Sequence, residues 1–223
     1  MLKSEVGFLA LISFGKFAKF WKVCSMNYLA HAYLSFHQPE ILVGNMISDF
    51  IKGKKQFDQP AMVQKGIRLH RAIDTFTDAH PVTAELKSFF RPQYRLYSGA
   101  FADVVYDHFL AIDTNEFVTE NMLKGFAATT YQVLEDNIIR LPPPFQKMLP
   151  HMKAYDWLYS YRYTDGIEKS FGGVVRRSAY LTESKIAFDI FTGNYTAMQS
   201  CYARFFPELK SFTTHQFHQL INS

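Results

Sequence analysis

Residues 60–77 place an imidazole and a carboxylate on a helical face that is otherwise apolar. With helical spacing, Val63 and Ile67 begin a stripe that His70 and Asp74 continue. Side chains at i and i+4 lie about 6 Å apart at Cβ, which is the separation that two metal ligands on one helix require. The pair therefore predicts one strip of a metal site.

A second stretch, FADVVYDHFLAI over residues 101–112, shows the same mixture of residue types. His108 falls seven residues after Phe101, in a slot that faces the core of the protein. Asp103 and Asp107 are four apart on a neighbouring strip, and Asp107 directly precedes His108. Taken alone, this helix fits a hydrogen-bonded core histidine with surface aspartates as well as it fits a site.

A third stretch, PEILVGNMISDFIKG, begins at Pro39 and ends at Gly53, a pattern typical of a helix with proline in its first turn. Asn45 and Asp49 share its mostly apolar face. A buried carboxylate needs a partner, so Asp49 is informative. His31, in NYLAHAYLSF, is a lone histidine on an apolar face, and we interpret it as a core residue.

Three helices that each turn Asp or His toward the core predict a shared site. Imidazole and carboxylate ligands without thiolates suit Mn, Fe, Mg or Zn. Such an ion neutralises charge on a phosphoryl oxygen, so we expect hydrolysis of a phosphate ester, with Arg71 or a nearby lysine binding the non-bridging oxygens. The predicted catalytic and metal-binding residues are Asp49, His70, Asp74, Asp107, His108 and Arg71.

The bulk composition predicts one all-α domain. The chain has 223 residues, of which 48% are hydrophobic and 20% charged, and the 22 Phe and 13 Tyr predict an aromatic core. Almost no alternation of period two is present, which argues against strands. The net charge of +4 is scattered, which disfavours nucleic acid as a partner and suits an acidic protein.

Residues 1–25 differ from the rest and are expected to be an N-terminal extension, with Met26 as an alternative start. Their apolar run is too short to span a bilayer, and lysines interrupt its continuation, so we expect an amphipathic helix and no membrane insertion. Cys24 and Cys201 are far apart and are expected to be free thiols in the reducing cytoplasm.

Four ordered blocks after this extension resemble the acyl carrier protein phosphodiesterase family. They are MNYLAHAYLSF, GNMISDFIKG, GIRLHRAIDTFTDAHP and VVYDHFLA, and the resemblance covers nearly all of residues 26–210. It implies that residues 26–223 form a single helical domain, a distorted variant of the HD phosphohydrolase fold. It also implies that the metal site uses Asp49, His70, Asp74, Asp107 and His108.

The activity that the resemblance implies is hydrolysis of the phosphodiester between 4'-phosphopantetheine and a serine of holo acyl carrier protein. Manganese is the expected ion, with Mg, Fe and Zn as alternatives. Because the carrier protein is acidic, we expect it to dock on basic residues, namely Lys52, Lys54, Lys55, Arg68, Arg176 and Arg177. Two alternatives remain at this point: an HD-type phosphohydrolase acting on a nucleotide or another small phosphoester, and a metal-free helical binding module.

Overall fold

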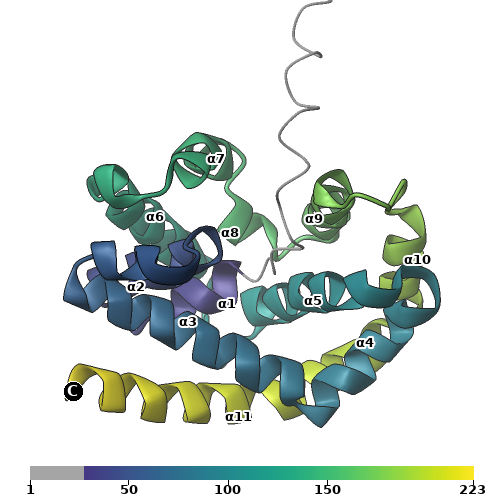
Figure 1. The fold of residues 1–223 in the computed structure, drawn as a ribbon. Coiled ribbons are helices and arrows are strands. Elements are labelled where there is room, and N and C mark those ends of the chain that lie inside the picture. Colours follow the sequence, from purple (N-terminus) through teal and green to yellow (C-terminus); the bar gives the residue numbers. More distant parts are fainter. Residues whose placement is uncertain (1–27) are drawn as a thin grey trace, which may run out of the picture.

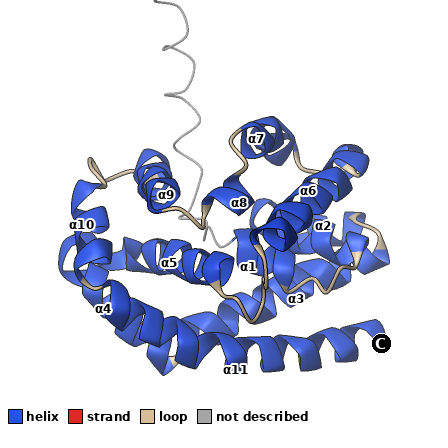
Figure 2. Ribbon diagram, turned by 180° about the vertical axis from the view of Figure 1, so that it is seen from behind, coloured by secondary structure: helices blue, strands red, loops and turns tan. Residues whose placement is uncertain are grey.

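The computed structural model describes residues 28–223, so the expected extension over residues 1–25 lies outside them. Within that range the secondary structure is helical without strands, which confirms the predicted all-α class (Figures 1 and 2). The α-helices are α1 (Tyr28–Tyr33), α2 (Pro39–Ile47), α3 (Ala61–Ala79), α4 (Pro81–Tyr94), α5 (Ser98–Ile112), α6 (Glu120–Asp136), α7 (Pro143–Ala154), α8 (Trp157–Ser160), α9 (Thr164–Arg177), α10 (Lys185–Gly193) and α11 (Tyr195–Ile221). Short 3-10 helices are η2 (Ser48–Phe50), η3 (Gly53–Asp58), η4 (Arg95–Tyr97) and η5 (Ile138–Arg140).

Helices α2 and α3 are packed closely enough that their backbones touch. A Cβ atom at Gly44 would lie 2.1 Å from the carbonyl oxygen of Val63, and one at Gly66 would lie 2.3 Å from that of Ile41. Only glycine fits at either position, because no side-chain atom can approach a backbone oxygen so closely. This contact brings the polar end of α2 against the middle of α3.

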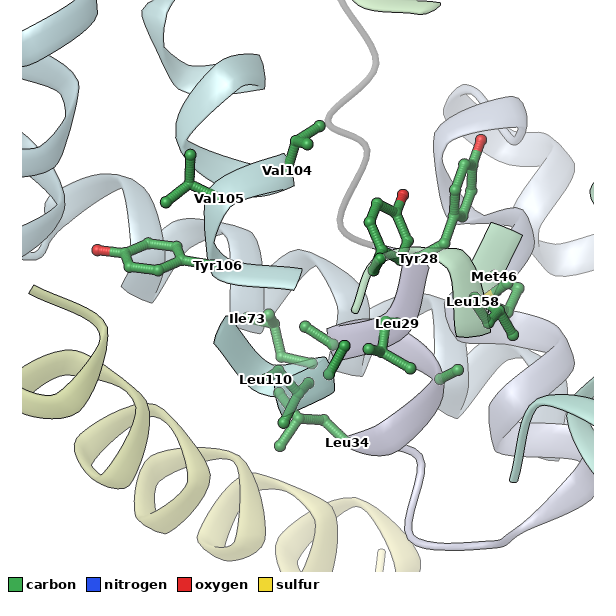
Figure 3. Packing of buried hydrophobic residues seen from close by; sticks show 14 of the residues in the cluster. Tyr28, Leu29, Leu34, Met46, Ile73, Val104, Val105, Tyr106, Leu110 and Leu158 are labelled. Carbon is green, nitrogen blue, oxygen red and sulfur yellow. The ribbon is translucent and has the colours of Figure 1, made fainter. Parts of the chain in front are cut away.

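The core lies between these two helices, α1 and α5. Figure 3 shows buried side chains from all these elements, including Leu29 of α1, Ile73 of α3 and Leu110 of α5, each with no exposed surface. Burying such a side chain stabilises the fold by roughly 1.5–3 kcal/mol. The long helix α11 packs along α3 and α4 and closes one side of the molecule (Figure 1).

The turn between α4 and α5 is tight and strained. Pro92 lies inside α4, which continues to Tyr94; the helix tolerates this proline because it lies in the last turn. Arg95 then has a positive φ of 46°, which is unusual for a residue with a side chain. No helix in residues 28–223 is both long and apolar enough to cross a bilayer.

Candidate metal centre

Two buried histidines and one aspartate meet where α1 and α3 come together. His31 Nε2 lies 3.2 Å from Asp74 Oδ1, and His70 Nε2 lies 3.1 Å from Asp74 Oδ2. The two imidazole rings are stacked with their centroids 3.9 Å apart. Among the described residues, these three form a group whose ligand atoms all lie within 4.8 Å of one another.

Asn45 of α2 fixes the tautomer of His31. The Asn45 amide nitrogen donates to the carbonyl oxygen of His31 at 2.9 Å and to Ser35 Oγ at 3.1 Å, so its oxygen faces the ring. That oxygen lies 2.7 Å from His31 Nδ1, which must therefore carry the proton. The other ring nitrogen, Nε2, is left with a lone pair.

The surroundings keep His31 in this neutral form. Burial lowers the pKa of His31, and the neighbouring His70 lowers it further. Nε2 then has no hydrogen to donate to Asp74, and it is a buried nitrogen without a hydrogen-bond partner. A lone pair that faces a carboxylate in a buried site needs a cation between them, so these residues fit a metal ion.

The distances in the cluster also fit a coordination shell. At metal–ligand bonds of about 2.1 Å, neighbouring ligand atoms are separated by about 3.0–3.4 Å. The two separations from Asp74 fall in that range, and so does the 3.3 Å between His70 Nε2 and Asp49 Oδ1. Burial alone would raise the pKa of Asp74, but the protonated imidazole of His70 holds it well below its usual range in the metal-free protein.

Of the residues predicted from sequence, the structure brings Asp49, His70 and Asp74 together. Asp49 arrives from η2 and His70 and Asp74 from one face of α3, an arrangement that follows from the Gly44–Gly66 contact. His31 was assigned to the core because it stands alone on its helical face. What distinguishes it is the buried Asn45 opposite, and only the folded chain shows that pairing.

Asp107 was expected among the metal ligands, and the structure places it elsewhere. Its Oδ2 accepts the backbone amide of Leu29 at 3.0 Å, and its Oδ1 accepts that of Ala30 at 2.8 Å. Both amides lie in the first turn of α1, which carries no acidic residue of its own there. Asp107 of α5 thus caps α1 from a distance. Burial raises the pKa of Asp107, although the two amides favour its charged form.

His108, also predicted as a ligand, is occupied outside the cluster. Its Nδ1 lies 2.7 Å from the carbonyl oxygen of Tyr161 and must donate to it, while Nε2 accepts from the hydroxyl of Tyr195 at 2.9 Å. Both ring nitrogens are therefore satisfied, one by the residue that follows α8 and the other by α11. The buried histidine of α5 is a packing residue, the alternative that its spacing left open.

Arg71, expected to bind phosphoryl oxygens, is held by the segment that precedes α3. Its guanidinium donates to Gln56 Oε1 at 2.7 Å and to the carbonyl oxygen of Ile51 at 3.4 Å. The expected docking residues Lys52, Lys54, Lys55, Arg68 and Arg176 are exposed, whereas Arg177 is half-buried.

Replacing Asn45 by leucine is expected to weaken metal binding by about ten- to a hundredfold, since residues that orient a ligand have effects of that size. Leucine removes the hydrogen bond that fixes the His31 tautomer and orients its ring. Calorimetric titration of metal-free protein with Mn²⁺ measures the effect. Asn45→Asp, which keeps the acceptor oxygen, is the matched variant. Equal affinities for Asn45→Leu and the parent protein would show that Asn45 does not orient His31.

Comparison with known proteins agrees with the resemblance in the sequence. The family model for acyl carrier protein phosphodiesterase matches residues 26–209. The acyl carrier protein phosphodiesterase of Photorhabdus laumondii is 28% identical, over 82% of this chain and 92% of the relative. That of Enterobacter sp. strain 638 is 30% identical, over 82% of this chain and 95% of the relative. A search of solved structures found none that matches. With a match that spans most of its length and a buried His/Asp cluster at its centre, the chain belongs to the acyl carrier protein phosphodiesterase family.

Proposed function

We propose that this protein is a metal-dependent phosphodiesterase that hydrolyses the bond between 4'-phosphopantetheine and the serine of holo acyl carrier protein. The observation that carries the proposal is the His31–His70–Asp74 cluster, in which a buried, unprotonated nitrogen faces a carboxylate. Family membership supports the substrate, since the curated relatives carry that name. The oxygen of water bonds to phosphorus, the bond from phosphorus to the serine oxygen breaks, and a proton from water ends on that oxygen, so apo carrier protein and 4'-phosphopantetheine leave.

The residues of the cluster would hold one divalent ion, with Mn²⁺ as the expected species. His31, His70 and Asp74 are the ligands, and Asp49 joins them through its position beside His70. The bound ion supplies positive charge and Lewis acidity for hydrolysis of the phosphodiester. Asn45 holds the proton on His31 Nδ1, and Asp107 holds the helix that carries His31.

The test is incubation of the protein with holo acyl carrier protein and Mn²⁺, followed by intact mass measurement of the carrier protein. Loss of the phosphopantetheine mass is expected with Mn²⁺ and not with a chelator. Parallel incubations with nucleotides and other small phosphoesters test the alternative substrate class. Turnover of those compounds without any action on the carrier protein would overturn the proposed substrate. If added Mn²⁺ changed neither the melting temperature nor the activity, the protein would instead be a metal-free binding module.

Metal binding is expected to strengthen as the pH rises. Burial alone would lower the pKa of His70, but hydrogen bonds with Asp49 and Asp74 outweigh it and raise the pKa to about 10 in the metal-free protein. Below that pH the ion must displace a proton from His70, so one proton is released for each ion bound. The dissociation constant for Mn²⁺ should then fall about tenfold between pH 6.5 and 7.5. Calorimetry in buffers of different ionisation enthalpy counts the proton, and a constant affinity across this range would contradict the assignment.

The exposed lysines in η3 and directly before it are the proposed docking site for the acidic carrier protein, together with Arg68 and the Arg176–Arg177 pair. Lys52, Lys54 and Lys55 lie a few residues beyond Asp49 and are open to solvent. Changing all three lysines to glutamate is expected to raise the KM for holo carrier protein at least about tenfold at low salt, with little change in kcat. The same triple change on exposed Lys147, Lys169 and Lys185 is the control. An unchanged KM would remove η3 from the docking surface.

A further inference from the structure

The metal centre forms one side of a cleft of about 390 Å³. Asp49 and Asp74 line it on the side of the cluster, and α4, η4 and the beginning of α5 contribute most of the other lining residues. Those residues include three cationic side chains, Lys87, Arg91 and Arg95. A substrate group that reaches the metal centre through this cleft therefore passes between carboxylates and cations.

The three cations are not equivalent. Lys87 forms an ion pair with Asp78 at 2.6 Å, and both residues line the cleft. Arg91 and Arg95 are exposed, and within residues 28–223 neither forms an ion pair. Two guanidinium groups at the edge of one cleft without acidic partners are suited to an anion with several oxygens, because arginine binds phosphate through paired hydrogen bonds.

A hydroxyl group in the same cleft also lacks a partner. Thr77 is only 5% exposed and lines the cleft, yet its Oγ1 makes no hydrogen bond within the described part of the chain. A buried hydroxyl without a partner is costly in a folded protein. An oxygen atom of a bound ligand would satisfy it.

The beginning of α5 adds positive potential at the same place. Ser98, Gly99 and Ala100 line the cleft, and no side chain caps the helix there. The N-terminus of a helix favours anions, since its amide groups and the helix dipole both point toward them. Arg95, with its strained backbone, lies just before this helix start.

The charges of the cleft match a phosphodiester. Its lining contains four carboxylates and three cationic side chains, an excess of one negative charge. A divalent ion at the metal centre reverses this excess to one positive charge, and a phosphodiester carries one negative charge. Arg71 contributes nothing to this balance, because it does not line the cleft.

We propose that Arg91, Arg95 and Thr77 form the subsite that binds the phosphoryl group of the substrate. The proposal rests on the proposed function, since the phosphoryl group is that of 4'-phosphopantetheine. Arg91 and Arg95 bind the non-bridging oxygens and hold phosphorus beside the metal centre, and Thr77 Oγ1 donates one further hydrogen bond. These three are binding residues for the reacting group, distinct from the residues that hold the ion.

The test compares two ligands that differ only in the phosphate, 4'-phosphopantetheine and pantetheine, titrated into the Mn²⁺-loaded protein by calorimetry. Arg91→Gln and Arg95→Gln are each expected to weaken binding of 4'-phosphopantetheine by about ten- to a hundredfold, because each loses charge-assisted hydrogen bonds. Affinity for pantetheine should not change. Arg91→Lys and Arg95→Lys keep the charge and should recover part of the loss. Arg140→Gln, in η5 and outside the cleft, is the matched control.

Manganese content and melting temperature, measured on each variant, show whether it remains folded and loaded. The subsite would be overturned if a variant bound 4'-phosphopantetheine and pantetheine more weakly to the same extent. It would also be overturned if both variants kept the parent affinity for 4'-phosphopantetheine. A parent protein that binds neither ligand would overturn it as well. Methyl phosphate serves as a third ligand: if its binding depends on the two arginines while holo carrier protein is not hydrolysed, the anion site stands and the proposed function fails. If both glutamine variants hydrolysed holo carrier protein at the parent rate, the proposed function would stand and the proposed subsite would be wrong.

Discussion

Replacing His31 by alanine lowers the rate of phosphopantetheine release from holo acyl carrier protein by at least about a hundredfold, more than loss of an orienting residue does. The side chain supplies one of the ligand atoms in the buried cluster, and the remaining His70 and Asp74 belong to a single helix. The cavity left by His31 offers no atom to replace Nε2. Intact mass measurement of the carrier protein gives the rate, and elemental analysis gives the manganese content.

His215→Ala is the control for this prediction, since His215 is exposed near the end of α11 and, among residues 28–223, hydrogen-bonds only to Gln219. It should keep both metal and activity. A His31→Ala protein that retains one manganese per chain and works at the parent rate would show that the ion is held without α1. Excess Mn²⁺ should restore only part of the rate, because fewer ligands bind the ion less tightly.

Asp107→Ala is expected to destabilise the protein by about 3 kcal/mol or more and to weaken metal binding as well. The substitution leaves the buried amides of Leu29 and Ala30 without an acceptor, and each such group costs about 1–3 kcal/mol. The first turn of α1 then loses its cap, and His31 on that helix is no longer held in place. Urea denaturation measures the stability, and phosphopantetheine release should slow at least about a hundredfold, as for a ligand.

The matched control is Asp165→Ala, which removes an exposed aspartate that forms an ion pair with Lys169 on α9 and should change stability by less than about 1 kcal/mol. If Asp107→Ala were as stable as this control, the capping role would be wrong. If it bound metal normally despite reduced stability, α1 would not depend on its cap to place His31. A direct ligand role for Asp107 predicts the opposite combination, a loss of metal with little loss of stability.

Helical spacing was sufficient to predict the residues that α3 and η2 contribute to the candidate metal centre. His70 and Asp74 share one face because they are four residues apart, and Asp49 follows the apolar face of α2, so both strips could be read from the sequence. That these two strips lie side by side in the folded protein could not be predicted from spacing. It depends on the backbone contact at Gly44 and Gly66, and two isolated glycines in helices do not indicate which partner they approach.

Asp107 shows why residue type alone did not decide the ligand set. A buried carboxylate needs a partner, and a metal ion and a pair of backbone amides satisfy that need equally well. The amides that Asp107 accepts lie 77 and 78 residues earlier in the chain, so no local pattern connects them. His31 was missed for the related reason that the residue fixing its tautomer, Asn45, faces it from another helix.

The phosphate-binding arginines could not be predicted from the sequence either. Arg71 follows His70 directly and was the natural choice for phosphate binding, yet on a helix adjacent residues point in different directions. Its guanidinium reaches η3 instead. Arg91 and Arg95 lie some twenty residues further on, and only the folded chain places them in the cleft that Asp49 and Asp74 also line.

The brevity of α1 has a consequence for the order in which this protein matures during synthesis. A helix of six residues does not form stably by itself, and its cap is an aspartate on α5. While the chain is still emerging from the ribosome, His31 is therefore present but unplaced until residue 107 has also been made and packed. If the cluster binds a metal ion as proposed, we therefore expect the ion to bind only after α5 has formed and packed against α1.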